Sequence, residues 1–127
     1  MVEDFVFATD CHPENKHTLV KAKEFAEKLG ARLHLVYINT ANNFKTSRES
    51  QECLREFAGE AQLPEQSLNV YNDVSVEKGI LNFASELNAG LIGISTHGRK
   101  GLAHFFNGSI SEDLVNHAVR PVITFKI

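Results

Sequence analysis

Glycines and basic residues crowd a short segment near the end of the chain, between an apolar run and a helix-like pattern. Gly98 and Gly101 precede the pair Gly108 and Ser109, and Arg99 follows the first glycine. Glycine lets the backbone approach a ligand closely, and the N–H groups at a helix start carry partial positive charge. Phosphate binds readily at such helix starts. The segment therefore predicts a phosphate site, to which the Ser109 hydroxyl adds a donor.

A second interpretation of the same residues needs no ligand. Ser109 and Glu112 form the pattern S-x-x-E, a capping box that starts a helix. Arg99 and Lys100 then belong to a solvated loop face. The segment also lacks the G-x-x-x-x-G-K-[ST] and G-x-G-x-x-G spacings of the common nucleotide loops. Spacing alone leaves both interpretations open.

Other residue types that could do chemistry lie close to the predicted strand ends. Asp10 follows an apolar run, where it could contact a ligand or cap the next helix. His97 could touch a phosphate or make a structural hydrogen bond. Cys11 and His12 are adjacent and have no partner spacing for a tetrahedral metal site. No set of nucleophile, base and orienting residue is apparent, so we predict no catalytic residue.

Apolar runs alternate with helical patterns along the whole chain. The expected strands are 4–10, 31–38, 67–73, 90–95 and 120–127, and the expected helices are 12–30, 48–62, 75–89 and 109–118. This alternation predicts an α/β fold, an open five-stranded parallel sheet with helices on both faces. Ligands bind such sheets beyond the carboxyl ends of the strands, where the strand order reverses. We expect the first, second and fourth strands to end near Asp10, Val36 and Ser95, at one common edge.

Length and composition restrict the class of protein. The chain has 127 residues, of which 43% are hydrophobic, and this favours one folded domain over 1–127. The net charge of −3 argues against nucleic acid as a partner. No apolar run is long enough for a membrane span. Cys11 and Cys53 are far apart in the sequence and form no C-x-x-C pair, which favours reduced thiols and a cytoplasmic location.

Three stretches together resemble the universal stress protein family. They are THGRKGLAHFFNGSISEDLVNHAVRPVITFKI at the end of the chain, GILNFASELNAGLIGISTHGR before it, and EKLGARLHLVYI after the first predicted strand. The resemblance covers nearly the whole chain and is weakest over 39–70. It implies an adenine nucleotide alpha hydrolase-like sheet with strand order 3-2-1-4-5.

The resemblance also implies particular nucleotide contacts. Members of the family that bind ATP carry G-x2-G-x9-G-[ST], and this chain has Ser95-x2-Gly98-x9-Gly108-Ser109. The base and ribose contacts of the family fall by position on Asp10 and Val36. Ser95 replaces the first glycine of the motif; it costs about 1 kcal/mol if its φ is positive and fits without strain if its φ is negative.

Two further departures from the family pattern lie outside the phosphate motif. Ala8 stands where the family often has Pro, and Val74 stands where it often has Gly. A valine at that position could narrow the adenine side of the site.

These observations predict an ATP-binding regulatory domain of the stress-response type, with Mg²⁺ as an optional companion of the nucleotide. The alternative is an interaction module that keeps the fold, binds no nucleotide and acts by dimerisation. In either case the resemblance implies a homodimer through the last strand, with Val122 and Thr124, and a protein partner that the sequence does not identify. We do not expect an enzyme, beyond slow incidental ATP hydrolysis. The H-x-G-H motif of nucleotidyl transferases is missing, since His97-Gly98 is followed by Arg99-Lys100.

Overall fold

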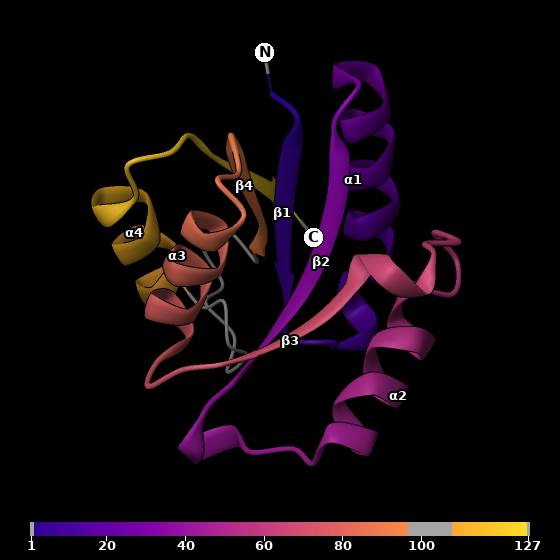
Figure 1. Cartoon of the computed structure of the whole chain (residues 1–127), viewed down its shortest axis with the longest axis vertical. Helices are drawn as coiled ribbons and strands as arrows, with labels where there is room; N and C mark the ends of the chain where they lie inside the picture. The colour runs from indigo at the N-terminus through magenta and orange to yellow at the C-terminus, as the bar shows by residue number, and fades with distance from the viewer. Residues whose placement is uncertain (1, 97–107, 127) are drawn as a thin grey trace.

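A computed structural model describes residues 2–96 and 108–126 of the chain. Its centre is a five-stranded sheet in which every pair of neighbouring strands is parallel (Figure 1). The strand order is β3-β2-β1-β4-β5, which confirms the predicted order. The strands are β1 (Asp4–Thr9), β2 (Arg32–Asn39), β3 (Leu68–Asn72), β4 (Leu91–Thr96) and β5 (Val122–Lys126).

Helices cover both faces of the sheet, as the alternating pattern predicted. The α-helices are α1 (Lys16–Leu29), α2 (Ser47–Ala58), α3 (Val76–Glu86) and α4 (Gly108–His117). Figure 1 shows α1 and α2 on one side of the strands and α3 and α4 on the other. The fold is therefore a three-layer α/β sandwich.

Each face of the sheet has its own apolar core. Because side chains alternate along a strand, Phe5 and Phe7 of β1 point to the α1 and α2 side, whereas Val6 and Ala8 point to the α3 and α4 side. All four side chains are fully buried. A strand covered on both faces must be apolar throughout, and this explains the continuous apolar run that marked β1 in the sequence.

Capping residues explain where two of the helices begin and one ends. Thr46 and Glu49 form a reciprocal capping box, which starts α2 at Ser47, one residue before the predicted start. The Ser75 hydroxyl accepts a hydrogen bond from the Lys78 N–H and starts α3. Gly30 ends α1 in the left-handed conformation, at φ 69°, which glycine adopts without steric cost.

The order of the strands reverses between β1 and β4. From β1 the chain moves outward through β2 to β3, and it then returns to the other side of β1 to form β4 and β5. The carboxyl ends of β1 and β4 consequently lie side by side at the switch point, which is where sheets of this type bind ligands.

The second strand was expected over 31–38, and β2 ends one residue later, at Asn39, paired with Asn72 of β3; the expectation that it ends near Val36 is wrong. The reason is that Tyr37 and Ile38 are as deeply buried as the residues before them, on opposite faces of the sheet. The predicted ends of β1 and β4 are within one residue of the observed ends.

Candidate functional site

The candidate site lies at the switch point, where β1 and β4 end and α1 begins. In the β1–β4 register Ala8 pairs with Ile94, so Thr9 and Ser95 come next at the mouth of the sheet. Asp10 leaves β1 immediately after Thr9. The structure therefore brings Asp10 and Ser95, two of the predicted site residues, to the same edge.

The Asp10 carboxylate organises the turn between β1 and α1. Its Oδ1 accepts hydrogen bonds from the His12 N–H at 3.0 Å and from the Asn15 Nδ2 at 2.8 Å. Its Oδ2 accepts none from the described residues. One oxygen thus stabilises the turn that leads into α1, but Asp10 is not a helix cap: the residues at the cap positions are His12 for the short 3-10 turn and Asn15 for α1.

Ser95 is buried, and its hydroxyl is used within the protein. It lies in β4 outside the left-handed region and only 2% exposed, so serine at this position causes no backbone strain. Its Oγ is 2.6 Å from the Oγ1 of Thr18 on α1. Because Thr18 gives its single hydroxyl proton to the Asn15 carbonyl oxygen at 2.6 Å, Ser95 is the donor in this pair.

Asn15 contains a buried hydrogen-bond acceptor with no partner in the described structure. The residue is 2% exposed, and its Nδ2 donates to Asp10 while its Oδ1 accepts nothing. The carboxylate fixes the orientation of the amide, because only the NH₂ group can face an acceptor. A buried acceptor without a partner costs about 1–3 kcal/mol, which a donor from a ligand would recover.

Cys11 continues the turn in an unusual backbone conformation. Its φ is 63°, and its N–H donates to the Thr9 Oγ1 at 2.9 Å. Burial, followed by the neighbouring Cys53 and Asp10, raises the pKa of the Cys11 thiol. Burial, followed by the nearby Cys11, Cys53 and Asp10, raises the pKa of Tyr37 to about 12. The Cys11 thiol and the Tyr37 hydroxyl therefore stay neutral at pH 7.

Two residues expected near a nucleotide base occupy different environments. Val36 lies three residues before the end of β2, with its side chain fully buried in the α3-side core. A base at the edge would therefore meet the residues after Val36 first. Val74, in contrast, is 78% exposed in the connection from β3 to α3, so its side chain is not packed into the sheet.

The phosphate segment is only partly described. α4 begins at Gly108 and contains Ser109, and this places the backbone of both residues in the first turn of the helix. Because β4 and β5 are parallel, the helix between them starts at the carboxyl edge, the edge that carries Asp10. His97, Gly98, Arg99, Lys100 and Gly101 lie outside the described residues, as do the side chains of the proposed capping box.

Sequence reasoning missed Asn15 and Thr18. Both lie on the first turns of the α1 region, at spacing i and i+3, which places them on one helix face. Both are polar, buried and hydrogen-bonded into the site. The available signal was a polar pair on the face whose other members, Leu19 and Ala22, are apolar and buried.

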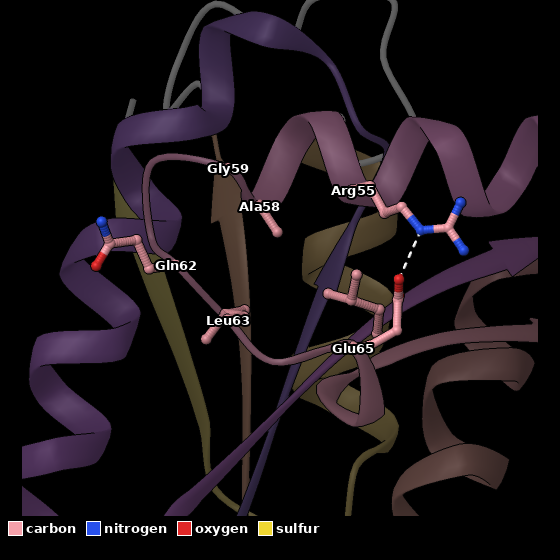
Figure 2. A pocket seen from close by; sticks show the side chains of 7 residues that line it. Arg55, Ala58, Gly59, Gln62, Leu63 and Glu65 are labelled. Atoms are coloured by element: carbon pink, nitrogen blue, oxygen red, sulfur yellow. Dashed lines mark hydrogen bonds and ion pairs between the residues drawn. The ribbon is translucent and has the colours of Figure 1, made fainter.

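Cavities elsewhere in the described structure make weaker candidates. Figure 2 shows one of about 200 Å³ at the end of α2, where Arg55 Nε and Glu65 Oε1 are 2.6 Å apart. The charges in this cavity neutralise each other. A second cavity, of about 370 Å³, adjoins the ends of β2 and β3. There the side-chain amide of Asn39 is hydrogen-bonded to the Lys45 backbone and to Asn72, so both polar atoms of that side chain are already paired.

In 2–96 and 108–126, no three His, Cys, Asp or Glu side chains are grouped to hold a metal ion. No helix within those ranges has the length and apolarity to cross a membrane.

Solved structures with the same fold include proteins bound to adenine nucleotides. A universal stress protein in complex with cAMP aligns with a TM-score of 0.72 at 16% identity, covering 99% of this chain and 98% of that one. A universal stress protein from Archaeoglobus fulgidus in complex with dAMP aligns at 0.69 and 23% identity, covering 98% of both. UspA from Lactobacillus plantarum aligns at 0.66 and 15% identity, covering 98% and 99%.

The family assignment comes from the sequence itself. No curated protein matches this chain. The profile of the Universal stress protein family, however, matches residues 1–126. The match spans all five strands. The chain belongs to the universal stress protein family.

Proposed function

We propose that the chain is an adenine-nucleotide-binding regulatory domain that holds ATP at the switch point between β1 and β4. One observation carries the proposal: the Asn15 Oδ1 lacks a partner beside the Asp10 carboxylate, whose Oδ2 is also unoccupied within the described residues. A ligand with two hydrogen-bond donors would satisfy both acceptors. The vicinal hydroxyls of a ribose supply such a pair.

Charge sets the orientation of the nucleotide. The Asp10 carboxylate attracts hydroxyl donors and repels phosphate, so the sugar lies at the β1 turn and the phosphates lie away from it. The start of α4, at Gly108 and Ser109, provides amide N–H groups at the same edge. The phosphates would rest there and on the segment that contains His97, Gly98, Arg99 and Gly101. The base would lie toward the end of β2, beyond Val36.

Similar folds that hold cAMP and dAMP support adenine as the base. ATP with Mg²⁺ is the form proposed for this chain, because the amides at the start of α4 suit an extended phosphate group. The role would be regulatory and cytoplasmic: occupancy by ATP would report the nucleotide state to a protein partner in the stress response.

Calorimetric titration of Mg²⁺-ATP into the wild-type protein and into the Asp10→Asn variant tests the proposal by comparing their affinities. The substitution keeps the shape of the turn and removes the charge that binds the ribose. We expect affinity to fall about tenfold or more, since a hydrogen bond to a charged group contributes about 1.5–3 kcal/mol.

Asp4→Asn is the matched control, because Asp4 begins the same strand at the opposite edge of the sheet. It should bind ATP like the wild type. Equal affinities in all three proteins, or no saturable binding by the wild type, would refute the proposed site.

A second candidate function rests on the position of β5. It forms the edge of the sheet with Thr124 and Lys126 exposed, and an edge strand offers backbone groups for pairing with another chain. A homodimer through Val122 and Thr124 would suit an interaction module with or without a nucleotide.

A further inference from the structure

Three buried polar residues form a chain of hydrogen bonds between β4 and the start of α1. The Ser95 hydroxyl donates to the Thr18 Oγ1, and the Thr18 hydroxyl donates to the Asn15 carbonyl oxygen, each at 2.6 Å. None of the three residues is more than 2% exposed. Both hydroxyl protons are paired, as buried hydroxyls require. The chain connects β4 with Asn15, the residue at the N-cap position of α1.

Further bonds hold Asn15 from other directions. Its Nδ2 donates to the Asp10 Oδ1 at 2.8 Å, and this bond decides which end of the amide carries the unpaired acceptor. Its backbone N–H donates to the His12 carbonyl oxygen at 2.9 Å. Together with the bond from Thr18, these contacts fix both the backbone and the side chain of Asn15 before a ligand binds.

An acceptor held so firmly discriminates between ligands. The Asn15 Oδ1 is buried and has no hydrogen-bond partner among the described residues. A ligand that presents a hydroxyl would pair it, whereas a ligand with only hydrogen at the same place would leave it unpaired. Sites built to bond a hydroxyl reject the analogue that lacks it, because their own polar group is then left without a partner.

We propose that Asn15 makes the nucleotide site selective for ribose over deoxyribose, and that Thr18 and Ser95 are the residues that position it. This inference rests on the proposed nucleotide site and adds its substrate class, the ribonucleotides. Asn15 Oδ1 accepts one of the two vicinal sugar hydroxyls and Asp10 Oδ2 accepts the other. Thr18 and Ser95 act through Asn15 and not on the sugar itself.

Calorimetric titration of the wild-type protein with ATP, 2′-deoxy-ATP and 3′-deoxy-ATP, each with Mg²⁺, tests the selectivity without any variant. We expect each deoxynucleotide to bind about 5- to 100-fold more weakly than ATP, which is the range for leaving one buried acceptor unpaired. In Asn15→Ala, one of the two deoxynucleotides should bind as well as ATP, because the hydroxyl that it lacks no longer has an acceptor to pair.

Thr18→Val tests the positioning role, since it removes the hydroxyl and keeps the shape of the side chain. ATP affinity should fall about three- to tenfold, and Thr18→Ser, which restores the hydroxyl, should recover it. In the Asn15→Ala background Thr18→Val should have no further effect on affinity, because the acceptor that Thr18 positions is gone.

Ser50→Ala is the matched control for the loss of a buried hydroxyl. Ser50 lies on α2, is fully buried, and donates to the Thr46 carbonyl oxygen at 2.9 Å. Its substitution should lower stability and leave ATP affinity unchanged.

The selectivity and the nucleotide site can fail separately. A wild-type protein that binds none of the three nucleotides overturns both. Equal affinities for ATP and the two deoxynucleotides overturn the selectivity and leave nucleotide binding in place. A preference for ATP that persists unchanged in Asn15→Ala also overturns it, because other residues then read the sugar. An equal effect of Thr18→Val with and without Asn15 overturns the positioning role.

Discussion

For Asp10 and Ser95, the role of one residue could be predicted from the sequence, whereas the partner of the other is visible only in the structure. Asp10 was identifiable because it follows an apolar strand and precedes a helix, and its Oδ1 does stabilise that turn. The partner of Ser95 was not identifiable. Thr18 is 77 positions away, and the contact between the two hydroxyls arises only when α1 packs across the end of β4.

Ser95→Ala tests this contact at the residue scale. Removing the hydroxyl leaves the buried Thr18 Oγ1 without its donor, so the free energy of unfolding should fall by about 1–2 kcal/mol. Denaturant unfolding followed by circular dichroism measures the change. Ser85→Ala, an exposed position on α3, is the control and should stay within about 0.5 kcal/mol of wild type. If Ser95→Ala also changed the free energy of unfolding by less than about 0.5 kcal/mol, the donor role of Ser95 would be contradicted.

At the scale of elements, helix propensity and packing disagree at Gly79. The helical pattern predicted α3, but glycine is a poor helix former, and the sequence alone does not explain its presence there. The structure does: a Cβ at Gly79 would lie 2.3 Å from the Ile38 Cγ2 of β2. α3 can approach the sheet this closely because the side chain is absent.

Gly79→Ala should therefore destabilise the fold by about 1–3 kcal/mol, although alanine favours helix. Gly59→Ala is the matched control. A Cβ at Gly59, at the end of α2, meets its nearest atom at 3.5 Å, so this variant should be neutral or slightly more stable. Thermal unfolding of both variants measures the difference. Stabilisation by Gly79→Ala would show that α3 does not pack on Ile38 as described.

The contact between α3 and α4 gives a dependence on pH. His117 Nδ1 is 2.6 Å from Glu77 Oε2, and the hydrogen bond to Glu77 raises the pKa of His117 above its ordinary value. A raised histidine pKa contributes stability that is fully present below about pH 6.5 and disappears as pH rises through the folded-state pKa. His117→Gln should therefore be less stable than wild type at about pH 5.5 and equal to it at about pH 9.

Chemical unfolding at both pH values measures this prediction. Glu77→Gln, which removes the partner of the histidine, should show the same loss at low pH. A difference between wild type and His117→Gln that stays constant with pH would show that the ion pair contributes nothing.

At the scale of the whole molecule, most of the fold could be predicted and the site only in part. Alternating strands and helices predicted the parallel α/β class, and the resemblance to the family implied the strand order. The apolar run over 31–38 predicted β2 to within one residue, whereas the expected end near Val36, taken from the site of a base contact, was three residues short. Asn15 and Thr18 escaped prediction. The partner of Asn15 is only five positions away, but its burial depends on the packing of α1, and the partner of Thr18 is Ser95, 77 positions away.

The position of β5 predicts an effect of Val122→Lys on the assembly. Val122 and Thr124 lie on the edge strand, and a charge between two copies would oppose their pairing. We expect light scattering to give a dimer mass for wild type and half that mass for Val122→Lys. Thr124→Arg should also halve the mass, and it disturbs the core less than Val122→Lys because Thr124 is exposed. Dimers that persist in both variants would exclude this interface.

A crystal structure of the wild-type chain grown with ATP and Mg²⁺ tests the nucleotide site most directly. The account predicts density for one nucleotide at the carboxyl ends of β1 and β4, with ribose hydroxyls hydrogen-bonded to Asp10 Oδ2 and Asn15 Oδ1 and phosphates at the start of α4. An empty switch point at saturating ATP, or a nucleotide bound at another edge of the sheet, would contradict it.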